Sequence, residues 1–277
     1  MKKKRTKLEK LKINISKTCR RIYWFFYTKI LYIYYSIKFF LYKKDLKKFK
    51  ISLLLPTRER SKKFQRMLNS LITTCYDIER IELLLLVDHD DKELNNYKTI
   101  IDNDRYKNLS IKIFIENIDT HAKRNNFLAN HSNKEILFPI NDDMIFQSKN
   151  WDIEIDKLFS KVNDIPFCVW IDAGQKSIYL HCEFPIINNI WYKRLGYVAS
   201  EYFKFWYLDT WICDLSYKSK RFFITKKIKV YQYSAYLIKE EIDNTTLKNI
   251  ENNNAKKDFQ TWHNTEEYRI KDAKLLK

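Results

Sequence analysis

The sequence predicts an α/β protein with a largely parallel, doubly wound central sheet. Short, fully apolar runs at residues 51–55, 81–87 and 136–140 have the length and composition of buried strands. Residues 61–75 lie between the first two runs and carry apolar side chains at helical spacing. Strands that alternate with helices in this way form parallel sheets with helices on both faces.

Each predicted strand is followed by polar residues at its carboxyl end. The run 51–55 is closed by Pro56-Thr57-Arg58, and the run 81–87 ends at Asp88. A third strand is expected at 111–115 and a helix at about 122–130, before the strand at 136–140 stops at Asn141-Asp142-Asp143. Doubly wound sheets gather the carboxyl ends of parallel strands on one side. We therefore expect these three polar segments to form one site.

The 277 residues, 45% of them apolar, are enough for one sizeable α/β domain with appendages. We expect a basic, aromatic helical arm at 1–48, the α/β domain at 49–240, and a polar, partly helical C-terminal tail at 241–277. Within the tail, the Asn- and Lys-rich residues 244–257 are expected to be mobile.

Most of the formal net charge of +18 lies in the first 50 residues. These hold 17 Lys and Arg against Glu9 and Asp45, whereas the remaining residues hold 35 basic and 32 acidic groups. A nucleic-acid-binding body is expected to carry its own basic surface. The nearly neutral body therefore argues against nucleic acid as a partner.

Residues 22–42 form an aromatic, apolar stretch with lysine-rich sequence on both sides. Its length could reach across a bilayer, but its two internal lysines, its many tyrosines and its basic flanks favour a helix that lies on an anionic membrane surface. The alternative is a helix that packs in the core or against a partner. No small-residue cleavage site follows the stretch, so we expect a cytoplasmic protein attached peripherally to the inner face of the cell membrane.

Cysteine and glycine usage excludes several kinds of site. The five cysteines lack CxxC spacing, which argues against a zinc site or a disulfide framework. Only Gly174 and Gly196 are present, so the chain has neither a Walker A loop nor a GxGxxG dinucleotide motif. Bound phosphates would have to be held by a metal ion and by side chains.

Asp142 and Asp143 are the candidate metal ligands. They follow a buried strand at the edge where open α/β sheets bind ligands, and carboxylate oxygens suit Mg²⁺ or Mn²⁺ holding a diphosphate. The alternative is an ordinary turn, because Asn and Asp are favoured there.

These strand-end motifs resemble the GT-A fold glycosyltransferases of the family 2 type, over about residues 51–225. In that family the first strand ends in a Pro-Thr-Arg-like loop, the second ends in an acidic residue that contacts the nucleoside base, and a DxD-like motif binds the metal. The segment His121-Ala122-Lys123-Arg124-Asn125 resembles the one in which a basic residue approaches the diphosphate. The resemblance implies nucleotide-sugar contacts for Pro56, Thr57, Arg58, Asp88, Arg124, Asn125 and Asp142, and a metal site at Asp142 and Asp143. Asp88 could instead be a turn residue, and Arg58 could pair with a surface acid.

The later segments 184–187, 191–197 and 205–211 resemble the acceptor half of bacterial members. Asp209 occupies the place of the family's catalytic carboxylate at the start of a helix, and Trp206, Trp211 and His181 are the implied acceptor contacts. Asp209 could also be a helix N-cap, and both tryptophans could be core residues. Asp214 is an alternative base that is expected to face solvent.

The resemblance implies a metal-dependent, inverting glycosyltransferase of the hexosyl type. It would move a sugar from a nucleotide diphosphate sugar to a hydroxyl of a glycan or lipid-linked acceptor, as in polysaccharide biosynthesis. Two departures keep alternatives open. The acidic motif is Asn-Asp-Asp, and 230–233 lacks the histidine that many related enzymes supply, with His181 and His263 as the candidate substitutes. The alternatives are a non-catalytic membrane-surface binding protein and a nucleotidyltransferase, although the latter usually needs a Gly-rich phosphate loop.

Overall fold

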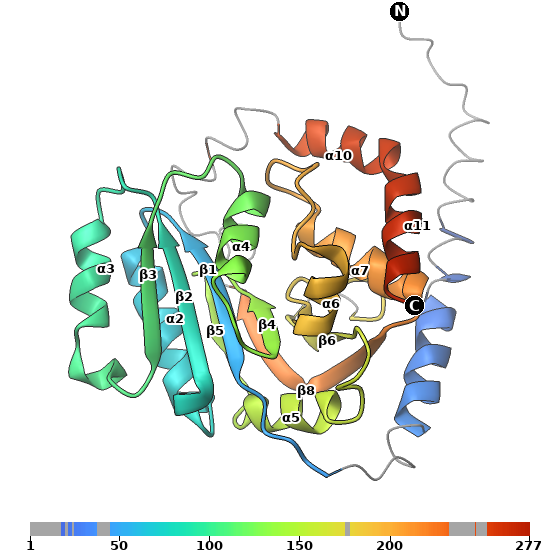
Figure 1. Cartoon of the computed structure of the whole chain (residues 1–277), viewed down its shortest axis with the longest axis horizontal. Coiled ribbons are helices and arrows are strands. Elements are labelled where there is room, and N and C mark those ends of the chain that lie inside the picture. Colours follow the sequence, from blue (N-terminus) through green and yellow to red (C-terminus); the bar gives the residue numbers. More distant parts are fainter. Residues whose placement is uncertain are drawn as a thin grey trace, which may run out of the picture.

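The computed structural model describes residues 18–19, 22–23, 25–37, 45–174, 178–232, 247 and 254–277. Within them, eight strands form one curled sheet in the order β3-β2-β1-β4-β7-β6-β8-β5 (Figure 1). The strands are β1 (Ile51–Thr57), β2 (Ile81–Val87), β3 (Ser110–Ile115), β4 (Ile136–Pro139), β5 (Met144–Phe146), β6 (Cys168–Asp172), β7 (Ile186–Asn188) and β8 (Phe222–Gln232). The helices are α2 (Ser61–Thr74), α3 (Leu94–Ile101), α4 (His121–Asn130), α5 (Trp151–Phe159), α6 (Asn189–Leu195), α7 (Leu208–Ser219), α10 (Asn254–Asn264) and α11 (Glu266–Leu275), with 3-10 turns at Ile78–Arg80 and Asp104–Tyr106.

The sheet is mixed but mostly parallel, as the sequence predicts. β3, β2, β1 and β4 are parallel neighbours, and β6 is parallel to β8. β7 is antiparallel to β4 and β6, and β5 is antiparallel to β8. The parallel half places the carboxyl ends of β1, β2 and β4 at one edge, where the polar segments follow.

The unbroken apolar runs are explained by burial on both faces of the sheet. Every residue of β1 and β2 is buried. The amphipathic α2 turns Phe64, Met67 and Leu71 inward, and α4 contacts β1 and β2. Figure 1 shows α4 in front of these strands and α2 behind them. This two-sided cover is typical of doubly wound sheets.

A helix at residues 25–37 packs against the body (Figure 1, blue). Thr28 and Tyr35 are almost fully buried. The Thr28 hydroxyl donates to the Tyr179 carbonyl at 2.9 Å, and the Tyr35 ring lies 5.5 Å from Phe167. Among the described residues, no helix combines the length and apolar character that crossing a membrane requires. The rest of the predicted arm lies outside the described residues.

The C-terminal residues 254–277 form two helices that pack on the body. α11 packs on α7, with Ala273 and Leu276 buried. The Arg269 guanidinium is also buried, 3.7 Å above the Trp262 ring, and its Nε donates to Asp214 at 2.8 Å. The mobility expected for 244–257 falls mainly on residues outside the described ranges, and residues 254–257 are helical.

Candidate functional site

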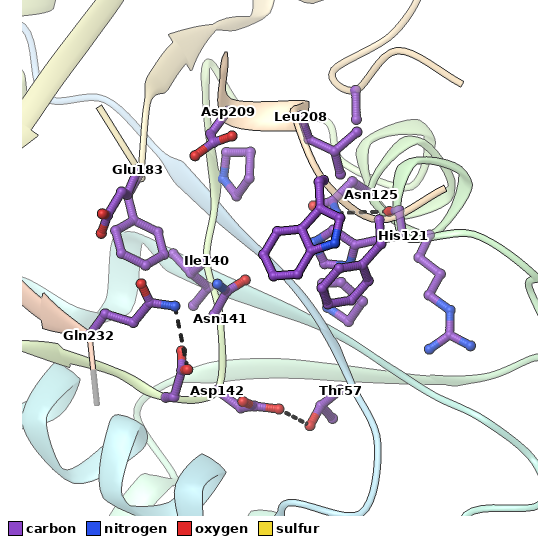
Figure 2. Close-up of a pocket in the computed structure, with 18 of the residues that line it drawn as sticks. Thr57, His121, Asn125, Ile140, Asn141, Asp142, Glu183, Leu208, Asp209 and Gln232 are labelled. Atoms are coloured by element: carbon purple, nitrogen blue, oxygen red, sulfur yellow. Dashed lines mark hydrogen bonds between the residues drawn. The ribbon is translucent and has the colours of Figure 1, made fainter. Parts of the chain in front are cut away.

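A cavity of about 420 Å³ opens at the carboxyl ends of β1 and β4. Its walls come from the loops after these strands, the start of α4, the segment before β7 and the start of α7. Figure 2 shows Asp209 and Glu183 together on one side, across from Asp142 and Thr57. The cavity brings together ten of the predicted site residues: Pro56, Thr57, Arg58, Arg124, Asn125, Asp142, Asp143, His181, Trp206 and Asp209.

Asp142 and Asp143 lie side by side and are both buried. Asp142 accepts hydrogen bonds from the Thr57 hydroxyl at 2.6 Å and from Arg60 Nη1 at 3.1 Å. Asp143 Oδ1 is buried and has no hydrogen-bond partner in the described part of the chain. Burial, together with the neighbouring charge of Asp142, raises the pKa of Asp143 to about 7. A cation is the natural counter-charge for two carboxylates buried in this way.

Gln232 completes this wall of the cavity. The antiparallel pairing of β5 with β8 places Gln232 opposite Met144, so that its amide reaches Asp143 Oδ2 at 3.4 Å (Figure 2). Within the described residues, no group of three or more His, Cys, Asp and Glu side chains is arranged to hold a metal ion. The donor set at this position is therefore two carboxylates and one amide.

Basic side chains line the cavity beside the carboxylate pair. Arg60 and Lys63 stand at the start of α2, and Arg124 stands on the first turn of α4. Lys123, the other basic residue of the segment 121–125 that resembles a diphosphate contact, instead pairs with Asp119 at 3.1 Å and does not line the cavity. Burial, with Arg124 and Arg60 nearby, lowers the pKa of His121 to about 4, so this imidazole is neutral at pH 7.

Asp88 does not line the cavity, although it was expected to contact the base. It is buried between two cavity-lining arginines: Arg58 Nη1 donates to it, and Arg124 Nη2 lies 2.7 Å from its Oδ1. Arg58 also makes a bidentate pair with Asp90 at 2.7 and 2.9 Å. In this arrangement Asp88 positions Arg58 and Arg124, and the base-contact role stays a prediction. Asn125 donates its amide to the His121 carbonyl at 3.0 Å.

Asp209 lies in the first turn of α7 and is paired with His181. The two side chains are 2.8 Å apart between Oδ2 and Nε2, and each is one-third exposed. Burial raises the pKa of Asp209, but the charge and hydrogen bond of His181 and two hydrogen bonds from Thr210 outweigh it, so the net pKa is lowered. Burial lowers the pKa of His181, but Asp209 and Glu183 outweigh it, so the net pKa is raised.

The helix-cap interpretation of Asp209 is wrong. Tyr207 occupies the cap position of α7, with a left-handed φ of 68° that is unusual for a residue with a Cβ. The Asp209 side chain instead accepts a hydrogen bond from the Thr210 amide at 2.7 Å. The structure also corrects the expectation for Asp214, whose side chain is only 9% exposed and forms ion pairs with Lys218 and Arg269 rather than facing solvent.

The two predicted tryptophans have different places. Trp206 lines the cavity with Phe184, Phe205 and Tyr207, as an acceptor contact would. Trp211 is fully buried, donates to the Tyr197 hydroxyl at 2.9 Å and does not line the cavity, so we withdraw it as an acceptor contact. His263, on α10, packs on Phe259 and likewise lies away from the cavity walls.

The aromatic wall is held in place by the C-terminal helices. Asp258 on α10 is buried and accepts hydrogen bonds from the backbone amides of Lys204, Phe205 and Trp206 at 2.8 to 3.0 Å. No local sequence pattern marks this contact, because Asp258 is more than 50 residues away along the chain. Arg60, Glu183 and Gln232 were missed for the same reason, since no local motif marks them.

Comparisons with known proteins identify the fold. No model of a known protein family matches the sequence, and no curated protein does. The structure resembles mannosyltransferase PcManGT from Pyrobaculum calidifontis, solved with GDP-Man and Mn²⁺, with a TM-score of 0.56 over 90% of this chain and 81% of that one, at 12% identity. The chain has the GT-A fold.

TarS from S. aureus is a second GT-A match. Its 1–349 fragment with UDP gives a TM-score of 0.53 at 15% identity, and the complex with UDP-GlcNAc gives 0.51 at 15% identity. The chain covers 60% of the TarS fragment with UDP, and 66% of the chain is matched. The GT-A arrangement accounts for a site at the ends of parallel strands.

Proposed function

We propose that this GT-A protein is a metal-dependent glycosyltransferase of the hexosyl type. It would transfer a sugar from a nucleotide diphosphate sugar to a hydroxyl of a glycan or lipid-linked acceptor, with inversion at the anomeric carbon. One observation carries the proposal: the carboxylate pair Asp142–Asp143 and the carboxylate of Asp209 line the same cavity from opposite sides. The similar GT-A structures, by their names a mannosyltransferase with GDP-Man and Mn²⁺ and TarS with UDP-GlcNAc, support the same class of donor.

The residues at the carboxylate pair fit a divalent cation. Asp143 Oδ1 is a buried carboxylate oxygen with no described partner, Asp142 is adjacent, and the Gln232 amide can turn its oxygen toward them. Asp142, Asp143 and Gln232 would hold Mn²⁺ or Mg²⁺. When bound, the ion supplies a Lewis acid for the departing diphosphate.

The basic wall supports binding of the diphosphate. Arg60, Lys63 and Arg124 place positive charge along the cavity, and α2 and α4 both begin there. Helix N-termini favour anions because the positive end of the helix dipole lies there. These groups would bind the diphosphate and stabilise the charge it gains as the sugar leaves.

Asp209 is the proposed general base. Its carboxylate would take the proton from the acceptor hydroxyl while that oxygen bonds to the anomeric carbon and the bond to the diphosphate breaks. Attack from the side opposite the diphosphate inverts the anomeric centre and needs no covalent intermediate. The aromatic wall with Trp206 would hold the acceptor, because sugar rings pack on aromatic faces.

The proposal is tested by thermal unfolding with UDP or GDP, with and without Mn²⁺. The matching nucleotide with Mn²⁺ at about 100 times its Kd should raise the melting temperature by roughly 5 °C or more. Asp143→Ala should remove the part of this rise in melting temperature that depends on Mn²⁺. Asp102→Ala, a control at an exposed residue, should show the full rise.

If the nucleotide raises the melting temperature equally in EDTA and in Mn²⁺, the proposed metal role is contradicted. No shift with either nucleotide would favour the non-catalytic binding protein, whose support is the lack of a histidine in the described end of β8. Turnover of a nucleoside triphosphate instead of a sugar donor would favour the nucleotidyltransferase.

A further inference from the structure

The N-terminal helix has two apolar faces, and only one of them contacts the body. A helix that is apolar all round is normally covered on every side. The inner face carries Thr28 and Tyr35, which are almost fully buried. The outer face is exposed to solvent although it carries no charged side chain.

The inner face is fixed to the body by specific contacts. Thr28 is bonded to the Tyr179 carbonyl, the Tyr27 ring lies 5.0 Å from Tyr217, and the Tyr32 ring stacks on Phe223 at 5.6 Å. These contacts come from three separate parts of the body. The orientation of the helix is therefore set by packing, and so is the direction in which the outer face points.

The outer face runs along the helical residues 22–23 and 25–37. At 100° per residue, its members fall within about one third of the helix circumference. Each is at least half exposed, from 50% for Ile22 to 62% for Tyr23 and Ile30. We define the outer face as Ile22, Tyr23, Phe26, Ile30, Ile33, Tyr34 and Ile37. An apolar strip of this length on one helix marks an interaction surface.

We propose that the outer face docks on an anionic membrane surface, with the helix axis parallel to the bilayer. Charge complementarity identifies this occupant. The first 50 residues hold 17 Lys and Arg against two acidic residues, and this excess of lysine stands on both sides of the apolar stretch. Anionic lipid attracts such flanks, whereas a second copy of the same basic segment would repel them.

The composition and fixed orientation of the face support the same occupant. Tyrosine is favoured where hydrocarbon meets water, and the face carries Tyr23 and Tyr34 among isoleucines. Because Thr28 and Tyr35 are held by the body, the helix can present one side to lipid and cannot insert across it. The exposed Lys226 adds positive charge beside the helix: its Nζ is 5.5 Å from the Tyr179 ring on which the helix packs.

The body segment on which the inner face packs lies close in sequence to the cavity wall. Tyr179 precedes His181 by two residues, and His181 is the partner of Asp209.

The test is cosedimentation of the full-length protein with vesicles. Wild-type protein should bind phosphatidylcholine vesicles that contain phosphatidylglycerol, and binding should fall without the anionic lipid and with added salt. The outer-face variant Phe26→Ser/Ile30→Ser/Ile33→Ser should bind roughly a hundredfold more weakly, because three apolar side chains no longer enter the interface.

The matched control is Phe259→Ser/Ile270→Ser/Leu275→Ser, which removes exposed apolar side chains from α10 and α11. It should bind vesicles as the wild type does, and the outer-face variant should keep the wild-type melting temperature within a few degrees. Equal vesicle binding by the outer-face variant would overturn the proposal. So would absence of wild-type binding, or a wild-type dimer that the outer-face substitutions dissociate.

The docking face is independent of the proposed transferase. If the outer-face variant loses vesicle binding but keeps its thermal response to nucleotide and Mn²⁺, docking and donor binding are separate properties of the chain. If the wild-type protein binds vesicles but shows no thermal response to nucleotides, only the proposed function is contradicted.

Discussion

At the scale of single residues, the carboxylate of Asp209, the proposed general base, is oriented by its neighbours. His181 engages Oδ2, and the Thr210 amide engages Oδ1. Both contacts keep the carboxylate charged and fix its direction, and a carboxylate oxygen still has a lone pair for a substrate proton. This geometry distinguishes Asp209 from Asp214, which forms ion pairs with Lys218 and Arg269.

Asp209→Asn should lower kcat by about a hundred- to ten-thousand-fold, the usual contribution of a general base. Donor binding should be unchanged, because Asp142 of the proposed metal site lies across the cavity from Asp209 (Figure 2). The check is steady-state kinetics together with the thermal response to nucleotide and Mn²⁺. A near wild-type rate would disqualify Asp209. Asp214→Asn, as the control, should affect stability more than rate.

The pair His181–Asp209 should also make stability depend on pH. The pKa of His181 is raised by folding, so its stabilising effect is complete below about pH 6.5 and is lost as the pH rises through the folded-state pKa. The lowered pKa of Asp209 gives an effect that is present above about pH 4 and lost in stronger acid. Since both groups are one-third exposed, the pair contributes under about 1 kcal/mol.

His181→Gln should therefore lower the melting temperature more at about pH 5.5 than at about pH 8.5. Differential scanning calorimetry at the two pH values measures the difference. A deficit that is constant or grows toward alkaline pH would show that the ion pair does not form.

Site residues could be predicted only where a local pattern marks them. The acidic pair at the end of the strand 136–140 and the acid before an apolar helix at 211–215 are such patterns, and both line the cavity. Trp206 and Trp211 could not be told apart from the sequence, because one lies in the loop that lines the cavity and the other on the buried face of α7, and both stand in the same aromatic segment. Gln232 depends on the register of β8 against β5, which no short segment encodes.

At the scale of elements, a buried ion cluster joins β2 to α5. Arg80, just before β2, donates to Asp152 at 2.8 Å and to Asp156 at 2.6 Å, and all three are buried. The carboxylates also accept the backbone amides of Tyr76 and Phe49. The cluster fixes the amino-terminal edge of the sheet, opposite the cavity.

Arg80→Met should destabilise the protein by about 3 to 5 kcal/mol, because two carboxylates are left buried without their cation. Arg80→Met/Asp152→Asn/Asp156→Asn should recover part of this loss, since it removes the uncompensated charges. Urea unfolding gives both values, with the exposed Arg105→Met as the control. If the triple variant is no more stable than Arg80→Met, charge burial is not the cause.

The first half of the fold was predictable and the second half was not. β1, β2 and α2 are long and uniformly patterned, so their bounds were predicted to within about two residues. β7 has only three residues and joins the sheet antiparallel, and β8 mixes exposed lysines with buried residues. Such strands are defined by their neighbours in the sheet rather than by their own periodicity.

At the scale of the whole molecule, the C-terminal helices are part of the body that forms the cavity. Removing residues 254–277 would expose Trp211, leave Asp214 without Arg269, and leave the amides of 204–206 without Asp258. We expect the shortened chain to lose several kcal/mol, a large part of a typical domain's stability. Near-ultraviolet circular dichroism and gel filtration should show lost packing and aggregation. Cooperative unfolding at the wild-type temperature would contradict this.

The contact of Asp258 with the backbone at 204–206 means that the two walls of the cavity are secured by different stretches of chain. The carboxylate wall is built into the sheet, whereas the aromatic wall is fastened from behind by the last two helices. The two walls can therefore change separately: replacing α10 and α11 by the corresponding helices of a related chain would reshape the aromatic wall of the cavity and leave the carboxylate wall unchanged.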